Sequence, residues 1–297
     1  MSYELKIVDC ENPETDYKLR NLIQAAFGTE ETIPEGHLFK NTVTAKSSKK
    51  SFFLVAEENN EFIGCNGFIA TDFKYNEKTY SCYQSCWTAT HPKHQGKRIF
   101  VNIINEAIRF LKEQGAGFIY GVPNDTSRPI FVKKLGFKEI PAVMMKIPAF
   151  SVLKNMGLSS SFEKDLKFYY QNVYLPVETQ ICDLKMNIAP DETIAINVNN
   201  SFAWGKIIKK QKFGITFKSF YVGGMEIQEP KDFELVINRI IKDYSISYIQ
   251  LVSCINNKYN NLSKGWKPAQ INPFIFYDLN EIPVTDINIM YGAIDVF

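Results

Sequence analysis

The feature that most limits how this chain can fold is a strand, a basic turn and an amphipathic helix that follow one another directly. Residues 78–90, KTYSCYQSCWTAT, have the composition of a strand, and the basic turn HPKHQGKR follows at 91–98. A helix is predicted over 95–114, where apolar side chains recur on one face: Phe100, Ile103, Ile104, Ala107, Ile108 and Leu111. Residues 118–122, FIYGV, then predict a buried strand. Two strands joined by a helix in this way predict an α/β fold.

The residues around this unit predict further helices and strands. Asn12, followed by proline, has the pattern of a helix start, and Gly28 ends the apolar repeat that follows. A second, weaker helix is predicted over 34–48. Extended segments are predicted at 1–8, 51–58, 61–73 and 137–147, and a short helix at 124–134.

The length of the chain predicts two domains. At 297 residues it is about twice as long as a typical domain. The best candidate for a linker is PAFSVLKNMGLSSS, which carries a proline, a glycine and three consecutive serines. We therefore expect a first domain at 1–148, a linker at 149–161 and a second α/β domain at 162–297.

The second half repeats the order of the first in a weak form. Helices are predicted at 162–175 and from Pro230 onward, with strands at 193–198, 213–222 and 246–254. Gly265-Trp266 follows a helix and a strand, as Gly136-Phe137 does in the first half. This echo predicts that the second half arose by duplication of the first.

The composition excludes several classes of function. A formal net charge of +2 is too small for a typical nucleic-acid or membrane-surface binder. The six cysteines form no CxxC pair and predict reduced, buried thiols. No apolar run approaches the roughly 20 residues of a membrane-spanning helix, and the N-terminus lacks the apolar core of a signal peptide. We therefore expect a cytoplasmic protein that binds no metal, no nucleic acid and no membrane.

The basic turn has two interpretations. A turn that leads from a strand into a helix presents unpaired N–H groups and the positive end of the helix dipole, so it binds phosphate readily. The basic side chains of Lys93, Lys97 and Arg98 suit such a ligand. A charged surface loop without a ligand would have the same composition, so the turn alone leaves both interpretations open.

The turn and its surroundings resemble the GNAT superfamily of acyl-CoA-dependent N-acyltransferases. The central motif of that superfamily runs Gln/Arg-x-x-Gly-x-Gly/Ala between a strand and a helix. Here it aligns with Gln95, Gly96, Lys97, Arg98, Ile99 and Phe100. Asn124, Ser127 and the sequence KKLGF at 133–137 match the downstream part of the family pattern. The resemblance is good over roughly 50–147 and loose beyond the linker.

The resemblance implies a fold, a co-substrate and its binding residues. The fold would be a mixed central sheet flanked by helices, with a second, smaller α/β domain that is a degenerate GNAT-like half. Acetyl-CoA or another acyl-CoA would be the co-substrate. It would bind at the motif, at the end of the preceding strand and along the short helix. These residues are Thr88, Ala89, Thr90, Gln95, Gly96, Lys97, Arg98, Ile99, Phe100, Asn124, Ser127 and Phe131.

The sequence also departs from the family pattern. Both motif glycines are replaced, by Arg98, which we expect to contact phosphate, and by Phe100, which we expect to pack on the sheet. Phe131 stands where many members have a tyrosine as acid, and Gln84 where some have a glutamate as base. Gln84, relaying a proton through water, and Tyr120, as a replacement acid, are therefore the candidate catalytic residues, with packing as the competing role of the tyrosine.

These observations predict an N-acyltransferase. An acetyl or short acyl group would pass from acyl-CoA to the primary amine of a small acceptor, such as an amino sugar, by direct attack in a ternary complex. The competing hypothesis is a GNAT-like protein that binds CoA or a partner without catalysis, because the usual acid and base are missing. The sequence leaves open the acceptor, the acyl length and the oligomeric state, for which a homodimer is one candidate.

Overall fold

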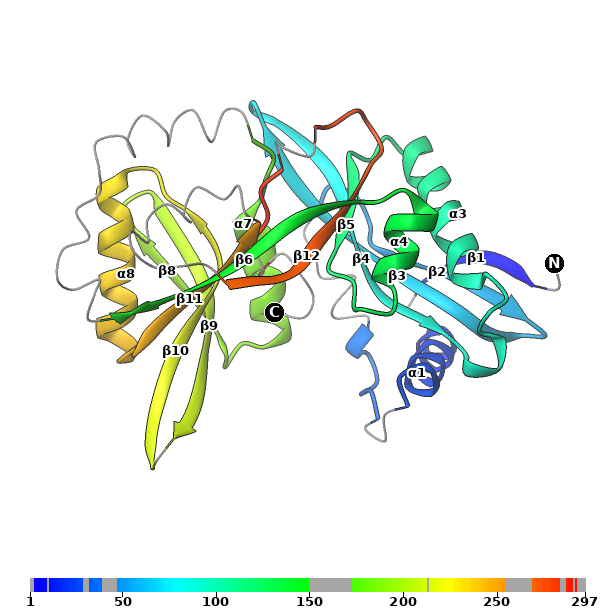
Figure 1. Ribbon diagram of the computed structural model, residues 1–297, viewed down its shortest axis with the longest axis horizontal. Helices are drawn as coiled ribbons and strands as arrows, with labels where there is room; N and C mark the ends of the chain where they lie inside the picture. The colour runs from blue at the N-terminus through cyan, green and yellow to red at the C-terminus, as the bar shows by residue number, and fades with distance from the viewer. Residues whose placement is uncertain are drawn as a thin grey trace. The chain divides into compact units, whose positions relative to one another are not determined.

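The structure of the protein is a computed structural model, and it describes residues 3–9, 11–28, 32–38, 47–149, 173–212, 214–254, 269–283, 287–290 and 292. Contacts within the chain group into two compact units (Figure 1). The first is formed by Met1–Asp72, Tyr80–Glu139 and Ile275–Val284, and the second by Phe73–Thr79, Ile140–Phe274 and Thr285–Phe297. Of the linker predicted at 149–161, only Ala149 lies among the described residues. The domain boundaries drawn from the sequence stay a prediction.

The first unit is a mixed sheet flanked by helices. Its strands are β1 (Glu4–Val8), β2 (Phe52–Glu58), β3 (Glu61–Tyr75), β4 (Lys78–Thr90), β5 (Phe118–Gly121) and the end of β12 (Ala269–Asp278). Their order across the sheet is β1-β2-β3-β4-β5-β12. β1 and β3 run antiparallel to β2, whereas β4 and β5 are parallel and are joined by α3 (Ile99–Glu113). The predicted strand–helix–strand unit is therefore confirmed.

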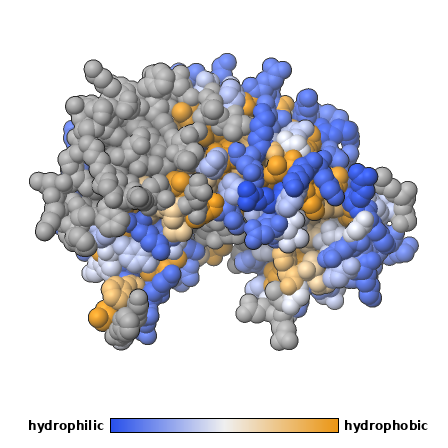
Figure 2. All heavy atoms as spheres, viewed as in Figure 1, coloured by the Kyte–Doolittle hydropathy of each residue, from blue (hydrophilic) through white to orange (hydrophobic). Residues whose placement is uncertain are grey.

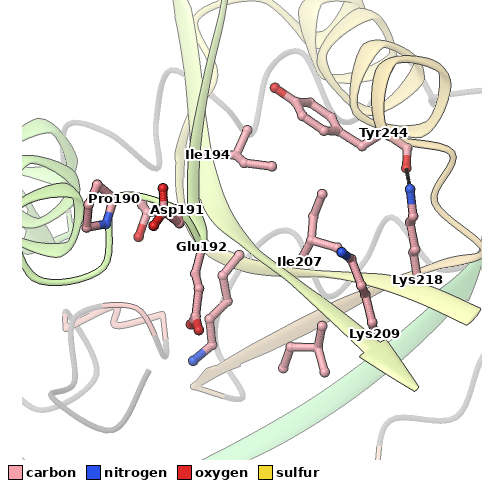
Figure 3. A pocket seen from close by; sticks show the side chains of 11 residues that line it. Pro190, Asp191, Glu192, Ile194, Ile207, Lys209, Lys218 and Tyr244 are labelled. Atoms are coloured by element: carbon pink, nitrogen blue, oxygen red, sulfur yellow. Dashed lines mark hydrogen bonds between the residues drawn. The ribbon is translucent and has the colours of Figure 1, made fainter. Parts of the chain in front are cut away.

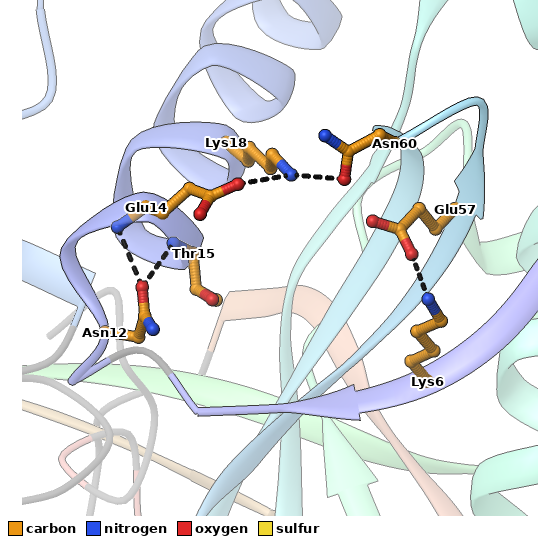
Figure 4. Close-up of polar contacts among 7 residues, drawn as sticks. All are labelled: Lys6, Asn12, Glu14, Thr15, Lys18, Glu57 and Asn60. Carbon is orange, nitrogen blue, oxygen red and sulfur yellow. Dashed lines mark hydrogen bonds and ion pairs between the residues drawn. The ribbon is translucent and has the colours of Figure 1, made fainter.

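The N-terminus of α1 (Pro13–Phe27) lies where the sequence predicts it (Figure 4). The Asn12 side chain accepts a hydrogen bond from the N–H of Glu14 at 2.9 Å. Lys18 pairs with Glu14 at 2.8 Å and also donates to the side chain of Asn60 at 2.9 Å. Because Asn60 lies in the turn between β2 and β3, this contact joins the helix to the sheet.

Two clusters of apolar side chains hold the sheet between its helices. Leu54 of β2 belongs to the first cluster and its neighbours Phe53 and Val55 to the second, so the clusters lie on opposite faces. The first cluster receives from α3 the buried residues Ile99, Val101, Ile103, Ile104, Ala107 and Leu111. α4 (Arg128–Leu135) packs on the same side. The second cluster receives from α1 the residues Leu19, Leu22 and Ile23.

α3 begins later than the sequence predicts. The apolar repeat predicts a helix from residue 95, but the chain first forms a 3-10 turn, η1 (Pro92–His94), and the helix starts at Ile99. Gly96 and Arg98 both have left-handed backbones, with φ angles of 78° and 61°. A right-handed helix cannot continue through such residues. The residues of the basic turn therefore form the entry to the helix and not its first turn.

The second unit also combines a sheet with helices. Its strands follow one another across the sheet in the order β6 (Lys138–Pro148), β11 (Tyr248–Cys254), β10 (Ile215–Glu226), β9 (Ser201–Lys212) and β8 (Thr193–Val198). β10 and β11 are parallel and are joined by α8 (Pro230–Tyr244), while β9 runs antiparallel to both neighbours. A short strand, β7 (Leu175–Pro176), precedes α7 (Glu178–Ile188).

The sequence-based prediction of the second unit is confirmed in part. The helix predicted from Pro230 is α8, whose buried residues include Phe233, Val236, Ile237, Ile240 and Ile241. The helix predicted at 162–175 lies outside the described residues up to 172, and β7 at its end is a strand. Gly265-Trp266 also lies outside the described residues, so the duplication stays a prediction. Within the described part of the chain, no helix is long and apolar enough to cross a membrane.

Glu178, the first residue of α7, is a buried carboxyl group. Trp204 Nε1 donates a hydrogen bond to Glu178 Oε2 at 2.9 Å. β10 makes room for this pair at a bulge beside Gly224, where a Cβ atom would lie 1.6 Å from Glu178 Oε2. Burial raises the pKa of Glu178 to about 8; the Trp204 hydrogen bond opposes this, and the nearby charge of Glu226 adds to it.

Candidate functional site

The N-terminus of α3 has the geometry of an anion site. Arg98 precedes the helix with φ 61° and ψ 17°, at the position of the first conserved glycine in the GNAT motif. This left-handed conformation costs a residue other than glycine about 1–2 kcal/mol. The N–H groups of Ile99, Phe100 and Val101 follow, and they have no acceptor within the described part of the chain. The turn thus has a left-handed backbone conformation, which glycine adopts readily, although arginine stands at this position.

The side chains of this turn are accessible to a ligand. Gln95, Lys97 and Arg98 are all exposed. Lys97 Nζ lies 3.3 Å from His94 Nδ1, and the same nitrogen of His94 lies 3.6 Å from Glu58. Arg98 has no carboxylate partner among the residues that the structure describes. Its guanidinium is therefore free to bind an anion that reaches the helix N-terminus.

The sheet opens where β4 leads into this turn. β4 and β5 share a short ladder, which pairs Tyr83 with Ile119 and Gln84 with Tyr120. β5 ends at Gly121, whereas β4 continues to Thr90. The predicted ligand-binding residues at 88–90 therefore lie beyond the last pair of the ladder, on the segment that joins the sheet to the anion site.

Three polar side chains of β3 and β4 hydrogen-bond to one another beside this opening. Asn66 is buried, and its Oδ1 accepts hydrogen bonds from Ser85 Oγ at 3.1 Å and from Thr88 Oγ1 at 2.5 Å. Its amide nitrogen donates to the carbonyl of Gly67 at 2.8 Å. The hydroxyl of Thr88 is thus committed to the protein, which leaves its main chain as the group that a ligand would contact.

The two candidate catalytic residues are neighbours, and both are buried. Gln84 is 3% exposed and Tyr120 is 0% exposed, and they face each other in the ladder of β4 and β5. The hydroxyl of Tyr120 donates to Thr71 Oγ1 at 3.0 Å. Tyr120 would therefore have to break this bond before it donated a proton to a leaving group. The structure brings the pair together, and their catalytic roles stay a prediction.

Phe100 and Phe131 lie in one aromatic cluster between α3 and α4. Their ring centroids are 5.0 Å apart and their planes 80° apart, and Phe131 also contacts Phe137 at 4.8 Å. Ile99, 1% exposed, lies directly against Gly64 of β3. Phe100 also packs against the apolar cluster on this face of the sheet, so its expected packing on the sheet stays a prediction. The predicted contacts of Phe100 and Phe131 with acyl-CoA stay predictions.

Asn124 and Ser127 close the first turn of α4. The side-chain oxygen of Asn124 accepts hydrogen bonds from the N–H of Ser127 at 2.8 Å and from its hydroxyl at 2.9 Å. The carbonyl of Asn124 accepts from the N–H of Arg128 at 2.9 Å. These contacts stabilise the start of the helix. The predicted role of Asn124 and Ser127 in binding acyl-CoA stays a prediction.

Trp87 is an unusual residue of β4 that the sequence pattern did not indicate. Its φ angle is 50°, which is rare for a bulky side chain. Its indole N–H is buried and has no hydrogen-bond acceptor among the residues that the structure describes, and its ring meets His37 edge-on at 5.9 Å. A buried donor without an acceptor is uncommon in folded proteins. In the sequence, Trp87 is one more apolar residue of a strand, so the sequence predicts neither its positive φ angle nor its buried N–H group.

Metal-binding groups and thiols are the other side chains that could carry chemistry. Among them, no group of three or more His, Cys, Asp and Glu side chains is arranged to hold a metal ion. The five described cysteines are buried and form no disulfide. Burial raises the pKa of Cys65 to about 12, so its thiol stays protonated and is a poor nucleophile.

Known proteins share this architecture. Residues 14–140 match the model of the acetyltransferase (GNAT) domain. A GCN5-related N-acetyltransferase from Anabaena variabilis has a similar structure, with a TM-score of 0.64 and 12% identity over 93% of this chain and 73% of the other. For Eis1 from Mycobacterium abscessus the TM-score is 0.61 and the identity 8%, with the same coverage. None of the curated proteins matches the sequence at a significant level.

The two kinds of match establish different things. At such low identities, the solved structures establish the fold alone. The family match covers the segment that carries the short β4–β5 ladder, the left-handed Arg98 and the N-terminus of α3. Residues 14–140 therefore match the GNAT acetyltransferase domain, and the solved structures share the fold.

Proposed function

We propose that this protein transfers an acetyl or short acyl group from acyl-CoA to the primary amine of a small acceptor. The observation that carries the proposal is the left-handed backbone of Arg98 directly before α3, whose first N–H groups have no acceptor among the described residues. Strained backbone of this kind concentrates at binding sites. Glu77 and Glu281 have similar φ angles elsewhere in the chain, so the position of Arg98 directly before α3, within the family motif, is what favours the anion-binding interpretation.

The residues present fit the diphosphate of an acyl-CoA. The N–H groups of residues 99–101 would hold it at the helix N-terminus, and Lys97 and Arg98 would add charge-assisted hydrogen bonds. The main chain of residues 88–90, beyond the ladder, would bind the pantetheine. When bound, acyl-CoA supplies a thioester whose thiol leaving group has a pKa of about 8.5. Such a group departs without a strict need for an acid, which offsets the absence of a tyrosine at Phe131.

The proton of the acceptor amine needs a path away from the reaction centre. Gln84 cannot take a proton, but its amide can hold a water molecule that relays one. Holding the amine against the thioester would supply most of the rate enhancement. General bases typically contribute about 10²–10⁴-fold to the rate. Without one, we expect turnover to be slow at neutral pH and to rise with pH, as the ammonium form of the acceptor loses its proton in solution.

Trp87 is suited to recognise the acceptor. Its indole N–H is buried and has no hydrogen-bond acceptor among the described residues, and it belongs to the residue directly before the segment 88–90, so a shift of the surrounding side chains would expose it to a bound acceptor substrate. An acceptor substrate that carries an oxygen near its amine could accept a hydrogen bond from this N–H. Amino sugars and amino alcohols have such an oxygen, whereas simple alkylamines do not. We therefore propose that the acceptor is a small amine with a neighbouring hydroxyl or ether oxygen.

The variant Trp87→Phe tests this role. It keeps an aromatic ring and removes the N–H, so the KM for an amino sugar is expected to rise about tenfold, because a site that loses one hydrogen bond loses roughly 1–2 kcal/mol of binding. The KM for acetyl-CoA should not change. An alkylamine without the oxygen is the control substrate, and its KM should be the same in both proteins. Equal amino-sugar KM values in the two proteins would contradict the role of the indole.

The proposed function is tested by the release of free thiol from acetyl-CoA in the presence of a panel of primary amines. Steady release that depends on the amine supports acyl transfer. A second function, non-catalytic binding of CoA, is favoured by Gln84 and Phe131, which replace the usual base and acid. Calorimetric binding of CoA together with no turnover over the whole panel would establish that second function and reject the first.

A further inference from the structure

The second unit contains a cavity of about 690 Å³ that the proposed acyl transfer does not use (Figure 3). It is bordered by the loop 190–192, the start of β8, the middle of β9, and one residue each of β10 and α8. Its volume lies within the range of about 300–1,000 Å³ that is usual for small-molecule sites. All of its lining residues belong to the second unit.

Two lysines meet at one end of this cavity. Lys209 of β9 and Lys218 of β10 are directly opposite each other in an antiparallel ladder, where like charges destabilise the pair. Lys218 Nζ is held by the carbonyl oxygen of Tyr244 at 3.3 Å, at the last residue of α8. The side chain of Lys209 is exposed and has no partner in the described part of the chain. An anion between the two ammonium groups would replace their repulsion by two attractive contacts.

The rest of the cavity restricts the kind of anion. Ile194, Ile207 and Tyr244 pack against the apolar core of the unit and supply apolar surface to the cavity. Asp191 and Glu192 lie at the opposite end from the two lysines (Figure 3). Lys206 also lines the cavity, but it already has an interaction partner within the chain, so the two carboxylates would repel a second negative charge on the ligand. The lining therefore suits one anionic group attached to an apolar body.

We propose that this cavity binds a small organic monoanion, with a carboxylate between Lys209 and Lys218 and an apolar body along Ile194 and Ile207. A medium-chain carboxylate has this chemistry. The site would be independent of acyl transfer, because none of its residues belongs to the matched acetyltransferase segment.

Hexanoate is a suitable probe, and its binding to the full-length chain can be measured by calorimetry. The variant Lys209→Glu is expected to weaken hexanoate binding at least about tenfold, since it replaces an attraction by a repulsion at a solvent-exposed site. It also converts the repulsive pair with Lys218 into an attractive one, so the variant should fold. Lys210→Glu is the matched control: Lys210 is exposed, follows on the same strand and points to the other face.

The outcomes separate the proposal from nonspecific binding. Wild-type protein and Lys210→Glu should bind hexanoate equally, whereas hexylamine, with the same apolar body and the opposite charge, should not bind. Equal affinity in Lys209→Glu and Lys210→Glu would overturn the proposal, as would the absence of hexanoate binding by wild type at millimolar concentration. If inorganic phosphate bound as tightly as hexanoate, the proposed role of Ile194 and Ile207 in binding an apolar body would be wrong. Circular dichroism verifies the fold, and Lys209→Ala serves as a second variant with the same expected direction.

Discussion

Replacing Arg98 by glutamate is expected to weaken the binding of CoA about 100-fold. Arg98 stands at the mouth of α3, where its charge and the unpaired N–H groups would meet the same diphosphate. Two unit charges about 4 Å apart near a protein surface interact by roughly 4 kcal/mol before screening. Because Arg98 is exposed, we reduce this to about 2–3 kcal/mol for the reversal, which corresponds to about two orders of magnitude in Kd. Calorimetric titration with CoA measures it, and the effect should shrink as salt is added.

Two further variants separate charge from conformation. Lys112→Glu changes the net charge by the same amount at the far end of the same helix, and CoA binding should be unchanged. Arg98→Gly removes the charge but accepts a φ angle of 61° without strain, so the free energy of unfolding should be equal or up to about 1 kcal/mol higher. Its CoA affinity should fall less than that of Arg98→Glu, because the N–H groups remain. If Arg98→Glu bound CoA like the wild type, the diphosphate site at α3 would be wrong.

The fold of the first unit could be predicted because its signals are local. α3 buries one face over four turns, and apolar side chains at helical spacing report this directly. The start of the helix could not be predicted in the same way. Its position depends on Gly96 and Arg98 in left-handed conformations, and arginine has no preference for that region.

The candidate site could be predicted only where it follows the family motif. The motif places the binding segment between β4 and α3, and the structure brings Gln84 and Tyr120 together in the adjoining ladder. Burial, however, is a property of the assembled sheet. The sequence gives no sign that the Tyr120 hydroxyl is occupied by Thr71, or that the indole of Trp87 has no acceptor. Both facts depend on strands that are distant in the sequence.

The second unit was harder to predict because its strands do not alternate cleanly. β9 carries lysines at 206, 209, 210 and 212, which suggest a solvated segment, yet it pairs with β10 from Phe202 to Lys212 and with β8 as far as Lys206. Where β9 and β10 extend beyond their other neighbours, both faces of this two-stranded hairpin are polar or exposed. Backbone hydrogen bonds, and not an apolar repeat, hold this part of the sheet together.

Replacing Glu178 by glutamine is expected to flatten the pH dependence of stability in the second unit. Burial holds the pKa of Glu178 at about 8 in the folded protein, against 4.5 for an accessible glutamate. The unfolded chain therefore loses this proton at a lower pH than the folded chain. The free energy of unfolding falls as the pH rises from about 4.5 to about 8, and this contribution is level outside that window. By pH 7 the loss is on the order of 3 kcal/mol, and glutamine, which has no proton to lose, avoids it.

Urea unfolding at about pH 5 and about pH 8 measures this difference, with tryptophan fluorescence as the signal because Trp204 contacts the carboxyl directly. Glutamine can still accept the hydrogen bond from Trp204, so Glu178→Gln should lose less stability than the wild type between the two pH values. Glu192→Gln, an exposed carboxyl in the same unit, is the control and should keep the wild-type dependence. If Glu178→Gln lost as much stability as the wild type over this interval, the carboxyl would not be held in its neutral form. The close approach of Gly224 to Glu178 would then have to be explained by packing alone.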